Sequence, residues 1–563
     1  MEVNCLNRLT ESCIMTKVAP TTDSEVKSSD SMAAREILEI PISKKNGETI
    51  LPQPCPVSAS VAKEVLKHEN GDQKHENGDS KPQQEVRELK DMPGPWPSLP
   101  LIGTSWQYLK GARYHNMDMY KSNEDKFRRY GPIMKEEFQW GKPVVQLFDP
   151  LDFEKVFLKQ GGHPLRRIME FVVHYRRNRP EKYDSAGLAN ASDEEWHKLR
   201  SIITPVLSKP RAVSLLTSRM DSVADDFSEL LRASRDPETL VIENFQDLAY
   251  RMALEGVYMM SLDTRLGCLD PNLQENTAAS DMILSVKLLF EAFHELFYGL
   301  PFWKWWETES YKKLDKAESL MYEATSRQIQ EVIEKLRNDP DDDEEGVLRT
   351  LIKNKQLTDQ QLIVSVIDLI SGGIFTVANA FSFLVYHIAT NPDVQEKLYE
   401  ELTSFMTDSE VTKERLARMR YLRVCVKESF RLSPTIPCVN RILTQDMVLS
   451  GYKVPAGTDV FCNFPVACMQ PDAFPEPERY NPDRWLVTKS EQTFSRFAIL
   501  PFGYGRRVCI GKGFAEMEMY IALAKLVYNY QIEYVGKDLE LKAAFINVPA
   551  NPISIILKDR IRD

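Results

Sequence analysis

Apolar side chains recur every three or four residues along most of the chain beyond about residue 91, which is the spacing of one face of an α-helix. The clearest helical segments cover residues 192–207, 218–234, 311–338 and 391–406. Alternating, strand-like runs are short and come late, and residues 446–464 have the pattern of a β-hairpin region. The pattern therefore predicts a mainly α-helical fold with a minor β-sheet region.

Two of the expected helices begin with the sequence of a capping box. Ser192 is followed three residues later by Glu195, and Thr358 is followed by Gln361. In this motif the first side chain accepts from a backbone N–H of the first turn, and the second reaches back to the first residue. We therefore expect helices to begin directly after Ser192 and Thr358.

The longest apolar segment covers residues 358–392. Its length would suit a membrane span, but Asp368, Asn379 and His387 lie inside it, and polar side chains are costly within a bilayer. A buried central helix is therefore the better interpretation. Gly372 and Gly373 lie in its middle at a cost of about 1 kcal/mol each relative to alanine, which indicates that something approaches the backbone closely there.

The first 90 residues have few aromatic side chains, many Lys, Glu, Ser and Pro, and the hexapeptide KHENGD twice. Such a segment buries too little apolar area to offset its chain entropy, so we expect residues 1–90 to be disordered. They contain no apolar run long enough for a membrane anchor. Glu2 and Glu11 are also atypical of a mitochondrial presequence. Residues 91–563 show no second linker and are predicted to form one large domain.

Charge and cysteine content exclude several classes of protein. The net charge of −11 at pH 7 argues against nucleic acid as the main partner, which would require a basic face. The nine cysteines include no CxxC pair and no even framework, so a disulfide scaffold and a zinc ribbon are both poor interpretations.

One cysteine has an unusual setting, in the stretch PFGYGRRVCIG at residues 501–511. Cys509 follows two arginines and precedes a long amphipathic segment that is predicted to be a helix. A helix N-terminus and nearby arginines both stabilise a thiolate, so we expect the pKa of this thiol to be low. Such a thiolate could act as a nucleophile or as an axial ligand of iron. A buried structural cysteine is the simpler alternative.

The full spacing of this loop, Phe502-x-x-Gly505-x-Arg507-x-Cys509-x-Gly511, resembles the haem-binding loop of the cytochrome P450 family, the haem-thiolate monooxygenases. The resemblance implies that haem b lies between the central helix and the cysteine-loop helix, with Cys509 as the iron ligand. Phe502 would shield the sulfur, and Gly505 and Gly511 would let backbone N–H groups approach it. Arg507 would pair with a haem propionate.

Four further sequence elements resemble the same family and occur in the order that is usual for it. The sequence WHKLR places Trp196 and Arg200 on one helix face, where the resemblance implies propionate contacts, and it implies another for Arg441. The remaining elements are the ESFR and YNPDRW stretches, which would supply a buried cluster formed by Glu428, Arg431 and Arg484.

The central helix resembles the oxygen-binding segment of the family. Thr376 would hydrogen-bond dioxygen or a proton-delivering water, and Gly372 and Gly373 would make room for dioxygen. Phe375 stands where the family usually has an acid that relays protons, which leaves Thr376, ordered water or Asp368 for that role. The departure also leaves open a haem-thiolate protein without oxygenase activity.

The expected substrate contacts are mostly apolar and suit a flat, lipophilic molecule. Several stretches, including residues 174–190 and 225–249, resemble the ecdysteroid-hydroxylating members of the arthropod mitochondrial branch, which implies a steroid substrate. A broad-specificity xenobiotic oxidase of the same branch is the alternative. The predicted substrate-binding residues are Ile374, Phe375, Ile436, Val439 and Val548.

The same branch takes electrons from an acidic [2Fe–2S] ferredoxin. Arg423 and Lys427, four residues apart, resemble its docking pair, and Lys512 would add a third basic contact. The branch usually has a second basic residue where this chain has Gly513. The resemblance implies peripheral attachment to the matrix side of the mitochondrial inner membrane, with the endoplasmic reticulum as the alternative.

Overall fold

The computed structural model describes residues 86–561 except residues 116, 140, 276, 300, 340–343, 489–491 and 493. Nearly all of the segment expected to be disordered therefore lies outside the described residues. Its last residues, however, are ordered. Strand β1 (Arg87–Glu88) pairs in parallel with β7 (Tyr452–Val454), and the Arg87 guanidinium lies 3.9 Å from the ring centre of Tyr452. The expected boundary at residue 91 is thus too late, because pairing with a distant strand is not visible in local composition.

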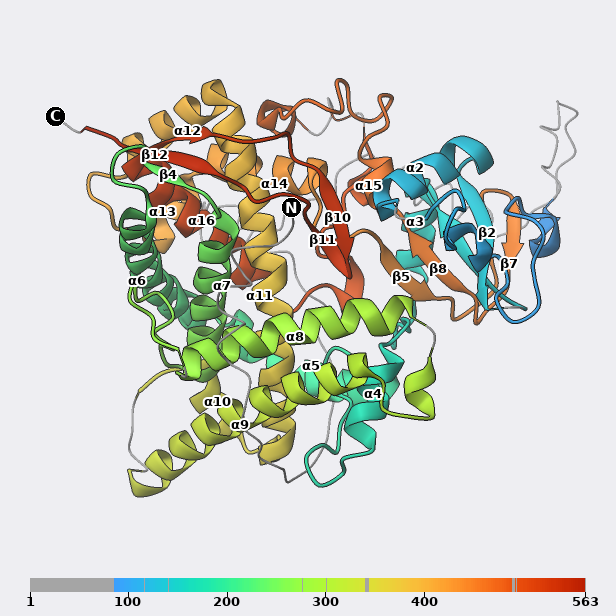
Figure 1. The fold of residues 1–563 in the computed structure, drawn as a ribbon, viewed down its shortest axis with the longest axis horizontal. Coiled ribbons are helices and arrows are strands. Elements are labelled where there is room, and N and C mark those ends of the chain that lie inside the picture. Colours follow the sequence, from blue (N-terminus) through green and yellow to red (C-terminus); the bar gives the residue numbers. More distant parts are fainter. Residues whose placement is uncertain are drawn as a thin grey trace, which may run out of the picture.

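Helices make up most of the described chain, as the apolar spacing predicts (Figure 1). The α-helices are α2 (Met119–Tyr130), α3 (Pro150–Leu158), α4 (Glu170–Arg177), α5 (Asp193–Ser208), α6 (Pro210–Ser234), α7 (Phe245–Leu262), α8 (Ala278–Tyr298), α9 (Glu309–Asn338), α10 (Val347–Asn354), α11 (Asp359–Thr390), α12 (Pro392–Phe405), α13 (Lys413–Arg418), α14 (Arg420–Leu432), α15 (Phe464–Ala467) and α16 (Lys512–Asn529). Short 3-10 helices are η1 (Leu89–Asp91), η2 (Ser105–Tyr108), η3 (Phe302–Lys304), η4 (Pro482–Trp485), η5 (Arg496–Ala498) and η6 (Gly505–Arg507).

The strands form small sheets, and the mainly α-helical class with a minor sheet region is confirmed. The largest sheet has the order β2-β3-β8-β5, with strands β2 (Ile133–Gln139), β3 (Lys142–Leu147), β8 (Asp459–Cys462) and β5 (Val439–Ile442). Strand β8 runs parallel to β3 and antiparallel to β5. The other strands are β6 (Met447–Leu449), β4 (Val241–Ile242), β9 (Tyr530–Tyr534), β10 (Leu541–Ala544), β11 (Ile546–Pro549) and β12 (Ile555–Asp559). The expected hairpin is present as the antiparallel pair β6–β7.

Helix α11 runs through the middle of the molecule (Figure 1). The expected capping box is present, because Thr358 Oγ1 accepts from the Gln361 N–H and the Gln361 side chain accepts from the Thr358 N–H. Among the described residues this is the one helix long and apolar enough to cross a membrane. Protein surrounds 72% of its most apolar stretch, which supports its interpretation as a buried central helix.

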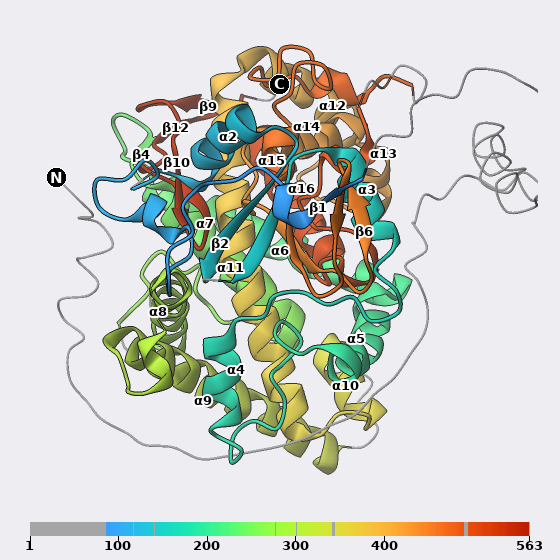
Figure 2. The ribbon, with the colours of Figure 1, turned by 90° about the vertical axis from the view of Figure 1, so that its right-hand side faces the viewer.

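The other elements are arranged around this helix. Helices α7, α9, α14 and α16 pack against α11, and α8 packs along α9. The β2-β3-β8-β5 sheet lies to the right of α11 in Figure 1, whereas α6, α7 and α10 lie to its left. Figure 2, turned by 90°, shows α11 passing behind β2 and down the length of the molecule. The cysteine-loop helix α16 is thereby brought against the central helix, as the family resemblance implies.

Candidate functional site

The loop around Cys509 is held by backbone contacts. The Cys509 N–H donates to the Phe502 carbonyl oxygen at 2.9 Å, and the Gly511 N–H bonds to the Cys509 sulfur. Gly505 has a φ of +75°, a left-handed conformation that glycine adopts without strain. The Phe502 ring packs edge-on against Phe430, with the ring centres 5.2 Å apart. The loop therefore presents its sulfur in a defined direction.

The pKa of the Cys509 thiol is raised, not lowered, so that expectation is wrong for the protein chain alone. Burial raises the pKa more than the Gly511 N–H, Arg200 and Arg166 lower it. Helix α16 begins only at Lys512, and the field of a helix end falls off within a turn. A thiolate here therefore needs the positive charge of a bound metal.

The thiol faces a space inside the fold. Cys509 is accessible to solvent, yet protein lies around it on nearly all sides. Gly372 is likewise exposed in the middle of the otherwise buried helix α11, and a Cβ added to it would meet nothing within 4 Å. The Arg166 guanidinium interacts electrostatically with both Cys509 and Asp368 of α11, so the cysteine loop and the central helix both lie near this arginine.

Four arginines surround the same region. Arg166, Arg200, Arg441 and Arg507 lie close enough that Arg166 lowers the pKa of each of the other three. Burial is the larger cause, and it brings the pKa of Arg507 to about 8 and those of Arg200 and Arg441 to about 10. Buried cations are costly unless they are paired. This cluster consequently fits a ligand that carries carboxylates, as the two propionates of haem b would.

Individual contacts hold these arginines in place. The Arg507 guanidinium lies 3.8 Å from the ring centre of Trp196 and donates to the Ala191 carbonyl oxygen. Arg441 Nε donates to Gln160 Oε1 at 2.9 Å. Arg166 was not among the predicted residues, and its buried Nε has no hydrogen-bond partner among the described residues. Its proximity to Asp368 and Cys509 depends on tertiary structure, so no local motif could have identified it.

The predicted cluster of Glu428, Arg431 and Arg484 is brought together as expected. Glu428 accepts from Arg431 Nε and Nη2 at 2.9 and 2.8 Å and from Arg484 Nε at 2.9 Å. The Asn481 N–H and Trp485 Nε1 also donate to the Glu428 carboxylate, at 3.0 and 2.9 Å. Trp485 directly follows Arg484 in the YNPDRW stretch but was not predicted to take part.

The glycines of α11 have different surroundings. Gly372 borders the internal space, and Thr376 Oγ1 donates to the Gly372 carbonyl oxygen at 2.7 Å. A Cβ added to Gly373 would lie 2.6 Å from Val257 Cγ2 of α7. Gly373 therefore permits close packing of two helices, and the expectation that it makes room for dioxygen is wrong.

The predicted substrate-binding residues differ in how deeply they are buried. Ile374 is fully buried in the helical core, so it does not line the internal space. Phe375 and the remaining three, Ile436, Val439 and Val548, are half-buried. Hydrogen bonds join the loop before β5 to strand β11. Asn547 Nδ2 donates to the Pro434 carbonyl oxygen and the Asn547 N–H donates to the Thr435 carbonyl oxygen, each at 2.8 Å.

The three basic residues predicted to dock a ferredoxin are exposed. Arg423 and Lys427 lie along α14, and Lys512 begins α16. The Lys427 ammonium lies 3.9 Å from the ring of Trp485, and Lys512 lies 6.0 Å from the ring centre of Phe502. Desolvation of the ammonium, which lies against the Trp485 ring, and the nearby charge of Lys512 lower the pKa of Lys427. The structure thus places Lys427 and Lys512 near each other, next to the cysteine loop.

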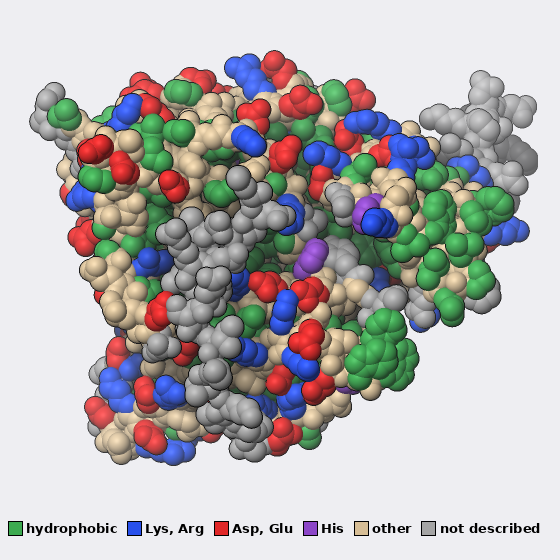
Figure 3. All heavy atoms as spheres, in the orientation of Figure 1, with side chains coloured by type: hydrophobic (Ala, Val, Ile, Leu, Met, Phe, Trp, Pro, Cys, Tyr) green, Lys and Arg blue, Asp and Glu red, His purple; other side chains and the backbone are tan. Residues whose placement is uncertain are grey.

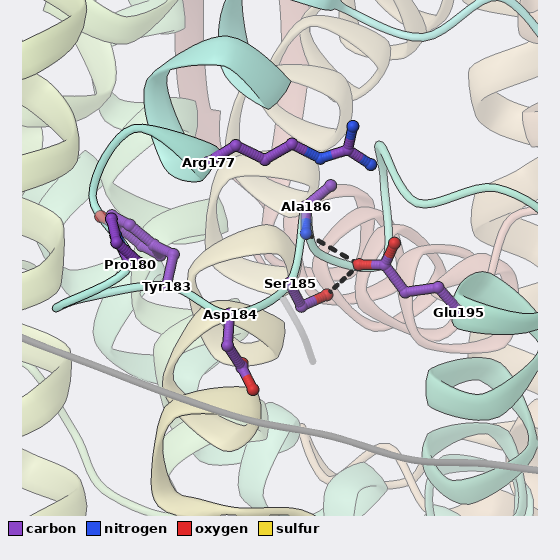
Figure 4. A pocket seen from close by; sticks show the side chains of 7 residues that line it. All are labelled: Arg177, Pro180, Tyr183, Asp184, Ser185, Ala186 and Glu195. Carbon is purple, nitrogen blue, oxygen red and sulfur yellow. Dashed lines mark hydrogen bonds between the residues drawn. The ribbon is translucent and has the colours of Figure 1, made fainter.

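An open cavity of about 460 Å³ lies beside the start of α5 (Figure 4). Glu195 points into it and accepts from the Ser185 hydroxyl at 2.6 Å and the Ala186 N–H at 2.9 Å. Helix α5 begins at Asp193 as expected, but the Ser192 side chain makes no capping bond, so the predicted capping box is wrong. Glu195 instead fastens the loop between α4 and α5. None of the predicted haem-site residues lines this cavity.

An accessible thiol near a long helix, with buried arginines beside it, is an arrangement that fits a haem-thiolate site. The family model of cytochrome P450 matches residues 93–557, so the chain belongs to this family. Its cofactor is haem b, which cytochromes P450 bind through a cysteine thiolate, and it is a cytochrome P450 monooxygenase.

Curated relatives cover most of the chain. Ecdysone 20-monooxygenase of Drosophila melanogaster is 35% identical over 491 residues, which is 85% of this chain and 90% of that protein. Cytochrome P450 302a1, mitochondrial, of the same fly is 32% identical and covers 82% of this chain and 93% of its own length. Cytochrome P450 CYP12A2 of Musca domestica is also 32% identical, over 80% of this chain and 88% of its own length.

Proposed function

We propose that the chain hydroxylates an ecdysteroid, converting ecdysone to 20-hydroxyecdysone. The observation that carries this proposal is the 35% identity to an ecdysone 20-monooxygenase over nearly the whole domain. The half-buried apolar side chains of Val439 and Val548 support a flat lipophilic substrate.

The residue at the centre of the reaction is Cys509, which we assign as the thiolate ligand of the haem iron. The haem supplies the oxidising chemistry, and the protein supplies binding, orientation and electrostatics. The Gly511 N–H bonds to the sulfur and thereby limits how much charge the sulfur donates. The arginine cluster would hold the two propionates, with Arg507 kept in place by the Trp196 ring.

On the opposite side, Gly372 and Thr376 would receive dioxygen. Gly372 leaves its side of the helix open, and the Thr376 hydroxyl is held by the Gly372 carbonyl oxygen while its oxygen can still accept a hydrogen bond. The overall reaction consumes substrate, dioxygen, two electrons and two protons, and it releases the hydroxylated product and water.

The electron donor in this proposal is an acidic [2Fe–2S] ferredoxin. Arg423, Lys427 and Lys512 are exposed, and the last two lie next to the cysteine loop, so a donor docked there would be close to the haem. Opposite charges on the two partners would also speed their encounter. Three relatives whose names include "mitochondrial" support a mitochondrial location.

Peripheral attachment to the inner membrane is part of the same proposal. Trp96 and Leu101 are each 85% exposed, and Trp305 and Trp306 after α8 are 72% and 57% exposed. Figure 3 shows two groups of apolar side chains on the right-hand side of the molecule. Exposed apolar patches of this kind are typical of membrane or protein contacts. Replacing both Trp305 and Trp306 by serine should weaken binding to vesicles containing anionic lipid.

The first test is a reduced, carbon-monoxide difference spectrum of the purified protein, followed by titration with ecdysone. A red-shifted thiolate band and a change of spin state with ecdysone are expected. A thiolate band without a response to ecdysone would overturn the substrate, and a xenobiotic panel would then be titrated. A Cys509→Ala variant that kept the thiolate band would overturn the assigned ligand.

A further inference from the structure

Phe375 stands at the position of the usual acid and belongs to an aromatic cluster. Its ring stacks on Phe290 of α8, with ring centres 4.0 Å apart and planes 10° apart. It also lies 4.7 Å from the ring of Tyr250 on α7. A packed apolar ring cannot relay protons, so another group must supply those consumed beside Thr376.

Asp368 is one of the candidates that the sequence offers for that role, but its carboxylate is bonded to other groups. Its Oδ1 accepts from Arg176 Nη1 at 2.8 Å, and its Oδ2 accepts from the Ala189 N–H at 2.8 Å. Both groups are buried, and the guanidinium is also bonded to Glu318. Both of its carboxylate oxygens are thus engaged in structural hydrogen bonds.

Asn379 and Tyr250 form a polar pair next to the aromatic cluster. Asn379 lies three residues after Thr376, so the two are neighbours on the helix surface. Its Nδ2 donates to the Tyr250 hydroxyl at 2.9 Å and to the Phe375 carbonyl oxygen at 2.8 Å. Its Oδ1 is buried and has no hydrogen-bond partner among the described residues. Because Tyr250 accepts from Asn379, its own O–H remains available as a donor.

An unpaired buried acceptor beside an available donor is the usual setting of a buried water. We propose that Asn379 Oδ1 and the Tyr250 hydroxyl hold an ordered water that delivers protons to Thr376, in place of the missing acid. The water passes one proton to the Thr376 oxygen, and the Thr376 O–H turns away from the Gly372 carbonyl oxygen to give its own proton to the oxygen being reduced. Tyr250 reprotonates the water and regains a proton from the solvent side of α7. The two protons of the reaction thus come from solvent.

Asp247 provides an entrance for these protons. It lies three residues before Tyr250 on α7, and Asn244 Nδ2 donates to its Oδ2 at 2.7 Å. Burial raises the pKa of Asp247 to about 6, while Lys287 and Arg251 act in the opposite direction. A carboxyl group that titrates near neutral pH can both take up and release a proton.

The test compares Tyr250→Phe and Asn379→Leu with the control Ser382→Ala, which removes a buried hydroxyl one turn further along α11. Each holoprotein receives electrons in the presence of a lipophile that changes its spin state. The two rates measured are hydroxylation driven by the donor and hydroxylation driven by added hydrogen peroxide, which already carries the protons. In the test variants, the donor-driven rate should fall about tenfold more than the peroxide-driven rate. Equal falls in both rates, or a result like that of the control, would overturn the proposal.

A second readout does not depend on turnover. A high-resolution crystal structure of the holoprotein should show a water within hydrogen-bond distance of Asn379 Oδ1, and Asn379→Leu should lack it. Phe375→Asp should restore the donor-driven rate in the Tyr250→Phe background. The absence of the water, or no restoration, would contradict the relay. The proposal rests on the monooxygenase class and not on ecdysone, whose binding the spin-state titration tests separately.

Discussion

The Arg176 guanidinium lies 2.8 Å from the Asp368 carboxylate, and this buried ion pair joins α4 to the central helix α11. Arg176 also donates to Glu318 of α9 at 2.9 Å, so one cation serves two buried carboxylates. A Cβ added to Gly187 would lie 2.4 Å from both Arg176 Nη1 and Asp368 Oδ2. The loop between α4 and α5 is therefore pressed against this pair, next to the internal space.

Replacing Arg176 by methionine should destabilise the protein strongly. Both carboxylates would lose their partner in a buried environment, which costs about 3–5 kcal/mol of the free energy of unfolding. The control is Arg179→Met, because the ion pair of Arg179 with Asp315 is partly exposed and contributes about 0–1 kcal/mol. Denaturant unfolding of the two variants measures the difference. Similar losses of stability in the two variants would contradict a special contribution of the buried Arg176 ion pairs.

Arg166 should matter for retention of haem. Its guanidinium is buried among three other arginines, and its Nε is available to an anionic ligand. Loss of one charge-assisted hydrogen bond corresponds to about tenfold faster haem release. We expect this for Arg166→Met in transfer of haem to excess apomyoglobin. The neighbouring Arg167→Met is the control, since the Arg167 side chain is 45% exposed and lies 3.7 Å from Asp459. Equal rates for both variants would count against a propionate contact by Arg166.

Trp485 should contribute to stability through its hydrogen bond to Glu428. Trp485→Phe removes a donor to a buried charged group at little cost in shape, and we expect a loss of about 1.5–3 kcal/mol in the free energy of unfolding. Trp305→Phe, at a side chain 72% exposed, should change it by less than about 0.5 kcal/mol. A stability loss for Trp485→Phe no larger than that for Trp305→Phe would show that the hydrogen bond to Glu428 is unimportant.

His387 should make the protein acid-sensitive. Its ring stacks on Tyr480 and shares a hydrogen bond with the Ser433 hydroxyl at 2.9 Å. Burial, with a smaller effect of Arg431, lowers the pKa of His387 to about 3. The unfolded chain binds a proton below about pH 6.5 while the folded protein does not, so stability is lost as pH falls through this range.

The loss should approach about 1.4 kcal/mol per pH unit below pH 6 and end near pH 3. Other groups titrate in the same range, so the informative quantity is the difference between the wild type and His387→Gln. The variant should show a flatter decline in denaturant unfolding between pH 6.5 and 5. Parallel curves for the two proteins would mean that His387 is protonated in the folded state.

Local chemistry was readable from the sequence. The capping box of Thr358 and Gln361, the β6–β7 hairpin and the grouping of Glu428 with Arg431 and Arg484 all follow their motifs. In the first two, the interacting groups are only a few residues apart, so neighbouring side chains and turns determine the geometry. The Glu428 cluster and the cysteine loop depend instead on a spacing specific enough to identify a family. Together these features determined the class of the protein and the cofactor it binds.

Only the tertiary structure decided where groups far apart in sequence meet. Glu195 bonds to Ser185 and not to the start of its own helix, and Gly373 packs against Val257. Arg166 lies in an arginine cluster that no local motif contains. The pKa of Cys509 is raised, because desolvation depends on everything that packs around the thiol. Burial and long-range pairing are properties of the folded chain as a whole, and these decide which polar groups remain available for chemistry.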